Sequence, residues 1–170
     1  VIGAFGAVAV MWLRRTMDES EQFTKMSSES KQSAGTIRAL MKHPKAVLTV
    51  VGLTLGGTVA FYTYTTYLQK FMVNTVGLEK EIVSWINFIA LLIFVVLQPL
   101  AGALSDKIGR RPLLLTFGIL GTLLTVPIFL IMENTTSPVV AFLLMMVGLI
   151  IVTGYTSINA IVKAELFPTE

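Results

Sequence analysis

Four long stretches without any charged residue dominate the hydrophobic pattern of the chain. They occupy residues 46–69, 82–105, 112–132 and 134–162. A helix rises about 1.5 Å per residue, so each stretch is long enough to cross roughly 30 Å of hydrocarbon. Pro138 lies inside the last stretch and is typical of the first residue of a helix. The pattern therefore predicts an all-α, polytopic membrane bundle with transmembrane helices at about 46–69, 82–105, 112–132 and 138–162.

Two segments of different character precede these helices. Residues 1–13 are apolar but too short to span a bilayer, and they predict the end of a transmembrane helix whose beginning is cut off. Residues 14–45 are rich in Ser, Gln, Glu and Lys and predict a solvated linker. Within this linker, Thr36 either caps a short helix at the membrane surface or belongs to a disordered tether.

Basic residues alternate between rich and poor connections along the chain. The linker holds seven Lys and Arg, and the turn at 105–111 holds three within seven residues. The segment from Lys70 to Glu81 has two lysines balanced by two glutamates, and the connection around Glu133 has no basic residue. By the positive-inside rule, linker 14–45 and turn 105–111 face the cytoplasm, and the other two connections face outside.

The composition argues against an enzyme. Only 14% of the residues are charged, against about a quarter in soluble domains. The chain has no cysteine and a single histidine, and no span holds a pair of carboxylates. These features predict no thiol nucleophile, no acid–base pair, no metal site and no cofactor.

One compact motif stands in the turn between the second and third stretches, at Gly102, Asp106, Gly109, Arg110 and Arg111. The first glycine allows two helices to approach closely, and the second allows the chain to reverse direction. The aspartate is one helical turn away from the first arginine, and both arginines can anchor the next helix at the headgroups. Taken singly, each residue is equally typical of any basic turn between membrane helices.

Together, these residues resemble the Gly-x-x-x-Asp-x-x-Gly-Arg-Arg signature of the major facilitator superfamily. The resemblance implies a 12-helix fold in which this chain supplies helices 7–10 and the end of helix 6. It also implies that Asp106 and the arginines form a charge cluster that holds one conformation of an alternating-access cycle. Glu165, Phe167 and Pro168 resemble the family's second cytoplasmic signature, and Glu165 is expected to pair with basic residues of the turn.

Residues 61–77, 98–112 and 155–170 resemble the metabolite:proton symporter branch of this family. The resemblance implies proton-coupled uptake of a small carboxylate, of the dicarboxylate type, across the inner membrane of a bacterium. The implied partners are the lipid bilayer, the carboxylate, protons and an amino-terminal half of the same protein, with no nucleic acid. Carriage of a betaine- or proline-type osmolyte or of a sugar stays open, as does a solute sensor built like a transporter.

Polar residues inside the predicted helices are candidates for substrate contact, because hydrocarbon penalises them unless they face a cavity or a neighbour. Tyr62, Thr66 and Gln69 share one helical face at i, i+4 and i+7, and their side chains can donate hydrogen bonds to a carboxylate. Tyr155 and Asn159 form a second stripe at i and i+4. The alternative for the tyrosine-rich segment is an aromatic belt at the membrane interface.

Two further expectations concern packing and charge. Gly52, Gly56 and Ala60 repeat at intervals of four and predict a close helix contact. No ionisable Asp, Glu, His, Lys or Arg falls within the four predicted spans. If the protein is a symporter, its proton site and its main substrate cation are therefore expected in an amino-terminal half of the protein or beyond Glu170.

Overall fold

The computed structural model describes residues 10–12 and 43–166. Residues 10–12 form part of a helix, and they belong to a separate unit from residues Lys45–Leu166. The other expectations for segments 1–13 and 14–45, including the helix after Thr36, lie outside the described residues. So do Phe167 and Pro168.

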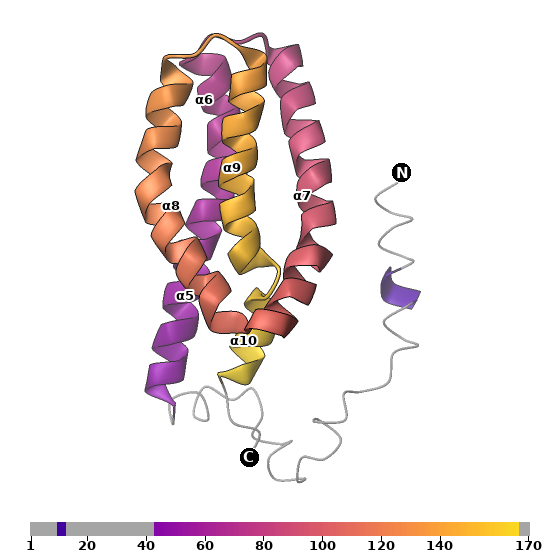
Figure 1. Cartoon of the computed structure of the whole chain (residues 1–170), viewed down its shortest axis with the longest axis vertical. Coiled ribbons are helices and arrows are strands. Elements are labelled where there is room, and N and C mark those ends of the chain that lie inside the picture. The colour runs from indigo at the N-terminus through magenta and orange to yellow at the C-terminus, as the bar shows by residue number, and fades with distance from the viewer. Residues whose placement is uncertain (1–9, 13–42, 167–170) are drawn as a thin grey trace. The chain divides into compact units, whose positions relative to one another are not determined.

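Four helices of membrane-spanning length and apolar composition form the larger unit (Figure 1). The first consists of α5 (Pro44–Tyr62), a π-helical segment η1 (Thr63–Tyr67) and α6 (Leu68–Asn74). It is followed by α7 (Lys80–Ile108) and α8 (Arg110–Glu133). The fourth consists of α9 (Pro138–Thr156) and α10 (Asn159–Glu165). The described residues contain no strand, and the predicted all-α membrane bundle is confirmed.

The helix boundaries differ from the predicted ones in two informative places. The first helix runs to Asn74 rather than Gln69, so Lys70 lies on the helix instead of beyond it. A long lysine stem can stay on a membrane helix while its ammonium reaches water, and charge alone therefore does not end the helix. The fourth helix is interrupted at Ser157 and Ile158, where the Ser157 hydroxyl donates to the Thr153 carbonyl at 2.7 Å.

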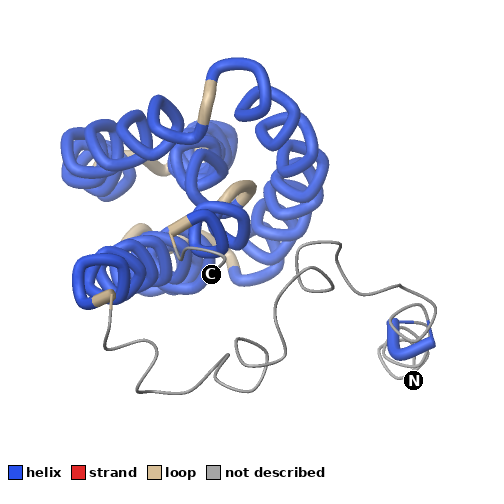
Figure 2. Tube along the Cα trace, turned by 90° about the horizontal axis from the view of Figure 1, so that it is seen from below, coloured by secondary structure: helices blue, strands red, loops and turns tan. Residues whose placement is uncertain are grey.

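Helix α9 forms the centre of the bundle. Figure 1 shows it between α7 and α8, with α6 behind it and α5 extending to the lower left, and Figure 2 shows the same helices from below. Its sequence is apolar on nearly all sides, which suits a helix with neighbours on several sides. Its buried residues are Ala141, Met145, Gly148, Leu149, Ile151, Val152, Thr153 and Tyr155.

Two tyrosine–glycine contacts join the first and fourth helices. The ring of Tyr64 lies directly against Gly148, and the ring of Tyr155 lies directly against Gly57. A Cβ atom added to either glycine would overlap the tyrosine ring, so only glycine fits at both positions. Both tyrosines are buried, at 1% and 5% exposure. The contacts are reciprocal, because each helix contributes one ring and one glycine.

These contacts correct the predicted packing stripe. A Cβ added at Gly52 or Gly56 meets no atom of the described structure within 4 Å. The close approach instead uses Gly57, which lies about 100° around the helix from Gly56 at 3.6 residues per turn. The spacing of small residues correctly predicted a tight contact on this helix, but not the face that makes it.

We expect Gly57→Ala to destabilise the full-length protein, because the added methyl group must displace the ring of Tyr155. Overpacking of this kind costs about 1–3 kcal/mol. Gly56→Ala is the matched control, since it makes the same change on the adjacent residue, where the structure leaves space. Thermal unfolding of the detergent-solubilised proteins measures the stability of both variants. Equal melting temperatures for the two variants would contradict the proposed contact.

Candidate functional site

A single residue joins α7 to α8. Gly109 has φ +91° and ψ 163°, a backbone conformation that favours glycine, and its amide donates to the Ser105 carbonyl at 2.8 Å. The backbone reversal predicted for this glycine is therefore present. The one-residue connection fixes the end of α7 against the start of α8, and so it positions the charged residues on either side.

Arg110 is the centre of a charge cluster that connects three helices. Its Nη1 donates to Asp106 Oδ1 at 2.5 Å and to Ser105 Oγ at 3.1 Å, both on α7. Its Nε lies 3.6 Å from Glu165 Oε1 on α10. The pairing expected for Glu165 is thus seen in the structure. The contact to Asp106 includes a hydrogen bond, whereas the 3.6 Å contact to Glu165 is too long for one, so the Glu165 contact is the weaker of the two.

A small apolar core supports this cluster from the bundle side. The buried side chains of Leu113, Ile158 and Val162 pack together, with Leu53 of α5 against them. Ile158 lies at the interruption between α9 and α10, and its burial anchors the short helix that carries Glu165. The interruption therefore helps to bring Glu165 to Arg110.

Two members of the sequence motif lie apart from the cluster. A Cβ at Gly102 would meet nothing within 4 Å among the described residues, so the close approach predicted there is not made inside this segment. Arg111 is exposed and has no ion pair in the described part of the chain.

A shallow groove of about 420 Å³ runs along one face of α5, η1 and α6. Every lining residue except one carries a hydroxyl or an ammonium group. The lining consists of Thr58, Val59, Tyr62, Thr63, Thr66, Tyr67 and Lys70. By contrast, the exposed face of α8 is aliphatic, with Leu115, Ile119, Leu123, Val126 and Leu130. The groove therefore carries several hydroxyl groups and one ammonium on a surface that is otherwise mostly apolar.

The structure brings two of the predicted substrate contacts into this groove. Tyr62, 58% exposed, and Thr66 both line it, whereas Gln69 is partly buried and does not. The π-helical segment η1 explains the difference, because a wider turn shifts the following residues around the helix. Lys70 takes the place on the groove that a regular α-helix would give to Gln69.

The predicted stripe of Tyr155 and Asn159 lies in the helix interface instead of the groove. The Tyr155 ring packs on Gly57 and stacks with Phe117 of α8, with ring centroids 5.4 Å apart. Its hydroxyl donates to Asn159 Oδ1 at 3.3 Å, across the interruption between α9 and α10. The arrangement gives this pair a packing role, and substrate contact by Tyr155 would require the helices to move.

Sequence reasoning missed two polar links between helices. The Thr156 hydroxyl donates to Gln98 Oε1 at 2.9 Å, which joins α9 to α7. The hydroxyls of Tyr64 and Thr125 are 2.6 Å apart, which joins η1 to α8. The available signal was the presence of polar residues in apolar spans, where such groups need partners. Asn87 Oδ1 of α7 is buried without a hydrogen-bond partner in the described part of the chain.

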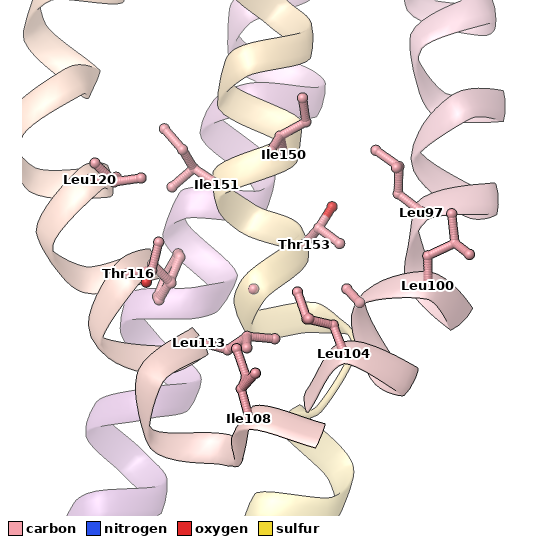
Figure 3. Close-up of a pocket in the computed structure, with 13 residues that line it drawn as sticks. Leu97, Leu100, Leu104, Ile108, Leu113, Thr116, Leu120, Ile150, Ile151 and Thr153 are labelled. Atoms are coloured by element: carbon pink, nitrogen blue, oxygen red, sulfur yellow. The ribbon is translucent and has the colours of Figure 1, made fainter. Parts of the chain in front are cut away.

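A second cavity, of about 390 Å³, lies between α7, α8 and α9 (Figure 3). Its walls are mostly aliphatic, including Leu100, Leu104 and Leu120. The hydroxyls of Thr116 and Thr153 donate to carbonyls of their own helices, Pro112 and Leu149. This cavity therefore offers no free donor to a carboxylate. Among the described residues, no group of three His, Cys, Asp or Glu side chains could hold a metal ion.

Comparison with known proteins agrees with this geometry. The family model described as Major Facilitator Superfamily matches residues 1–170. The chain belongs to this family. It is 46% identical to the alpha-ketoglutarate permease of Escherichia coli strain K12, over 99% of the chain and 38% of that protein. No solved structure matches.

More distant relatives in the superfamily carry other names. The Escherichia coli shikimate transporter is 27% identical over 74% of the chain and 30% of its own length. The proline/betaine transporter of the same strain is 26% identical over 94% of the chain and 34% of its own length. The chain thus spans less than two-fifths of these relatives. The four helices are part of the major facilitator fold, and the relatives are transporters rather than enzymes.

We expect Asp106→Asn to reduce uptake by the full-length protein more than Glu165→Gln, since Asp106 makes the shorter bond to Arg110. Lys107→Gln is the control, because it removes a neighbouring exposed charge that makes no ion pair in the described structure. Initial uptake rates, normalised to the amount of protein in the membrane, show how the three variants rank. A loss for Lys107→Gln as large as that for Asp106→Asn would show that net charge matters, not the cluster.

Proposed function

We propose that the chain forms part of a secondary active transporter that imports a small dicarboxylate of the alpha-ketoglutarate type together with protons. The observation that carries this proposal is the 46% identity to the alpha-ketoglutarate permease over nearly the whole chain. Transport proceeds by alternating access, in which two halves of the protein rock around a central site. No reaction at the substrate is needed in this cycle.

The groove on α5, η1 and α6 forms one wall of the transport path. Its hydroxyls face water and substrate rather than lipid, because a hydroxyl-rich helix face is costly in hydrocarbon. Tyr62 and Thr66 donate hydrogen bonds to a carboxylate in this path. Gln69 contacts substrate only in a conformation that turns its side chain toward the groove.

The described helices correspond to helices 7–10 of the 12-helix fold, with residues 1–13 as the end of helix 6. The amino-terminal half of the same protein supplies the opposite wall of the path and the proton-binding residue. The protein lies in the inner membrane of a bacterium. Linker 14–45 and turn 105–111 face the cytoplasm, in accord with their basic residues.

The cluster of Asp106, Arg110 and Glu165 stabilises one conformation of the transport cycle at the cytoplasmic side. Gly102 and Arg111 contact the amino-terminal half of the protein. Support comes from the position of Arg110, which joins α7, α8 and α10 through its contacts. Breaking the contact to Glu165 releases α10 while the bond to Asp106 holds α7 and α8 together. A difference in bond strength within the cluster therefore sets which helix moves first.

An osmolyte carrier is the second candidate, because relatives named for proline and betaine match most of the chain. The exposed rings of Tyr62 and Tyr67 favour this alternative, since aromatic faces attract quaternary ammonium groups. Lys70 on the same groove opposes it, because an ammonium side chain repels a cationic ligand and attracts a carboxylate. The charge of the groove therefore favours the dicarboxylate.

We expect cells that express the full-length gene to accumulate labelled alpha-ketoglutarate, and an uncoupler to abolish the accumulation. Unlabelled dicarboxylates compete, whereas proline and glycine betaine do not. Competition by the osmolytes alone would favour the second candidate. Specific binding in proteoliposomes without accumulation would indicate a sensor instead of a carrier.

The orientation has its own test. Tags inserted beside Glu133 and beside Arg111 are expected on opposite sides of the membrane, because α8 runs between them for 24 residues. The tag at Arg111 is accessible only after the inner membrane is permeabilised. Labelling of both tags in intact cells would disprove the proposed topology.

A further inference from the structure

Lys70 lines a groove whose other residues, except Val59, carry hydroxyl groups. It is the only residue with a formal charge between Lys45 and Glu79. Its side chain is exposed and lines the same groove as Tyr62 and Thr66. In the described part of the chain, the ion pairs all belong to Arg110, so no carboxylate there neutralises Lys70.

The spacing along the helix suits a bound carboxylate. Lys70 follows Thr66 by four residues, about 6 Å along the helix axis. The Thr66 hydroxyl makes no hydrogen bond among the described residues, whereas the hydroxyls of Thr63 and Thr65 donate to the carbonyls of Val59 and Phe61. A carboxylate has two oxygens, and these can accept from the ammonium and from the free hydroxyl together.

A lysine near the end of a membrane helix has a simpler explanation. Its stem can lie along apolar surface while its ammonium reaches the headgroups, with no role in binding. Lys80 provides a comparison at the same end of the bundle, as the first residue of α7 (Figure 1). It is also exposed, but it does not line the groove. The two lysines therefore lie toward the same end of the bundle and differ in their relation to the groove.

We propose that Lys70 is the cation that receives one carboxylate of the substrate at the outer end of the groove. Its ammonium attracts the dianion into the transport path, and the hydroxyls of Thr66 and Tyr62 bind the substrate further along. The expectation that the main substrate cation lies outside these helices is thereby revised, because the helix continues past Gln69. This inference rests on the proposed function and names the residue that selects an anion.

The test compares Lys70→Gln, Lys70→Arg and Lys80→Gln in the full-length transporter. Uptake kinetics are measured with labelled alpha-ketoglutarate, and competition is measured with analogues in which either carboxylate is replaced by an amide. We expect Lys70→Gln to raise KM about tenfold or more, because a charge-assisted hydrogen bond is lost. The maximal rate per transporter stays within about twofold, since binding rather than the conformational cycle is affected. Lys70→Arg and Lys80→Gln keep KM near the wild-type value.

The amide analogues distinguish direct contact between Lys70 and a substrate carboxylate from a general effect of positive charge on substrate affinity. In the wild type, one of the two amide analogues competes more weakly than the dicarboxylate. In Lys70→Gln this difference disappears, as expected if the lysine ammonium interacts directly with that carboxylate. The inference is overturned if Lys70→Gln keeps the wild-type KM, or if Lys80→Gln raises KM equally. Should Lys70→Gln fail to accumulate in the membrane, Lys70→Met preserves the apolar stem and carries the same expectation. Absence of alpha-ketoglutarate uptake by the wild type would refute the proposed function itself, whereas the outcomes above refute only the role of Lys70.

Discussion

Two tyrosine rings, each packed against a glycine, hold the first and fourth membrane helices together, and most other features of the bundle depend on this contact. Tyr64 lies on Gly148 and Tyr155 lies on Gly57, so the helices approach more closely than ordinary side chains permit. Within lipid the hydrophobic effect does not drive helices together, and close van der Waals packing takes its place. Each tyrosine then uses its hydroxyl elsewhere, Tyr64 toward Thr125 and Tyr155 toward Asn159. The contact thus joins α5, η1 and α9 and orients α8 and α10 as well.

This arrangement connects the groove to the charge cluster without a direct contact between them. The π-helical segment η1 buries Tyr64 in the bundle and leaves Tyr62 and Thr66 exposed on the groove. At the other end of α9, Tyr155 reaches across the helix interruption to Asn159, on the same short helix as Glu165. A change in the groove that moved η1 would therefore act on α9 first and on the cluster through α10. Contiguous packing of this kind provides a physical route for coupling between the groove and the cluster.

The sequence predicted the features that follow from charge and length. Lipid excludes charged residues from long helices so strongly that four spans, and the Asp106 turn between two of them, can be recognised from composition. Residues on either side of a one-residue connection are close in space, so Asp106 near the end of α7 reaches Arg110 at the start of α8. The pairing of Glu165 with Arg110 was expected from the resemblance to a family signature, and the structure contains it.

The features that the sequence did not predict depend on how helices rotate and bend. Neither Gly nor Pro marks the interruption at Ser157 and Ile158, where hydroxyls instead compete for backbone carbonyls. The π-helical segment has no signature in a pattern of hydroxyls and aromatic rings, yet it moves Gln69 off the groove and Lys70 onto it. The choice of Gly57 over Gly56 likewise depends on the rotation of α5 against α9. Such rotations are decided by tertiary packing, which a single sequence does not record.

The aliphatic cavity beside the one-residue turn has a mechanical consequence. Close-packed interiors resist small displacements, because every side chain that moves must push another. Here about 390 Å³ between α7, α8 and α9 is free of protein atoms, next to Ile108 and Leu113 at the turn. The ends of these helices can therefore tilt toward one another by repacking side chains into the void. The bundle therefore has space for side-chain movement beside the turn that carries Arg110, next to Phe117, on which the ring of Tyr155 stacks.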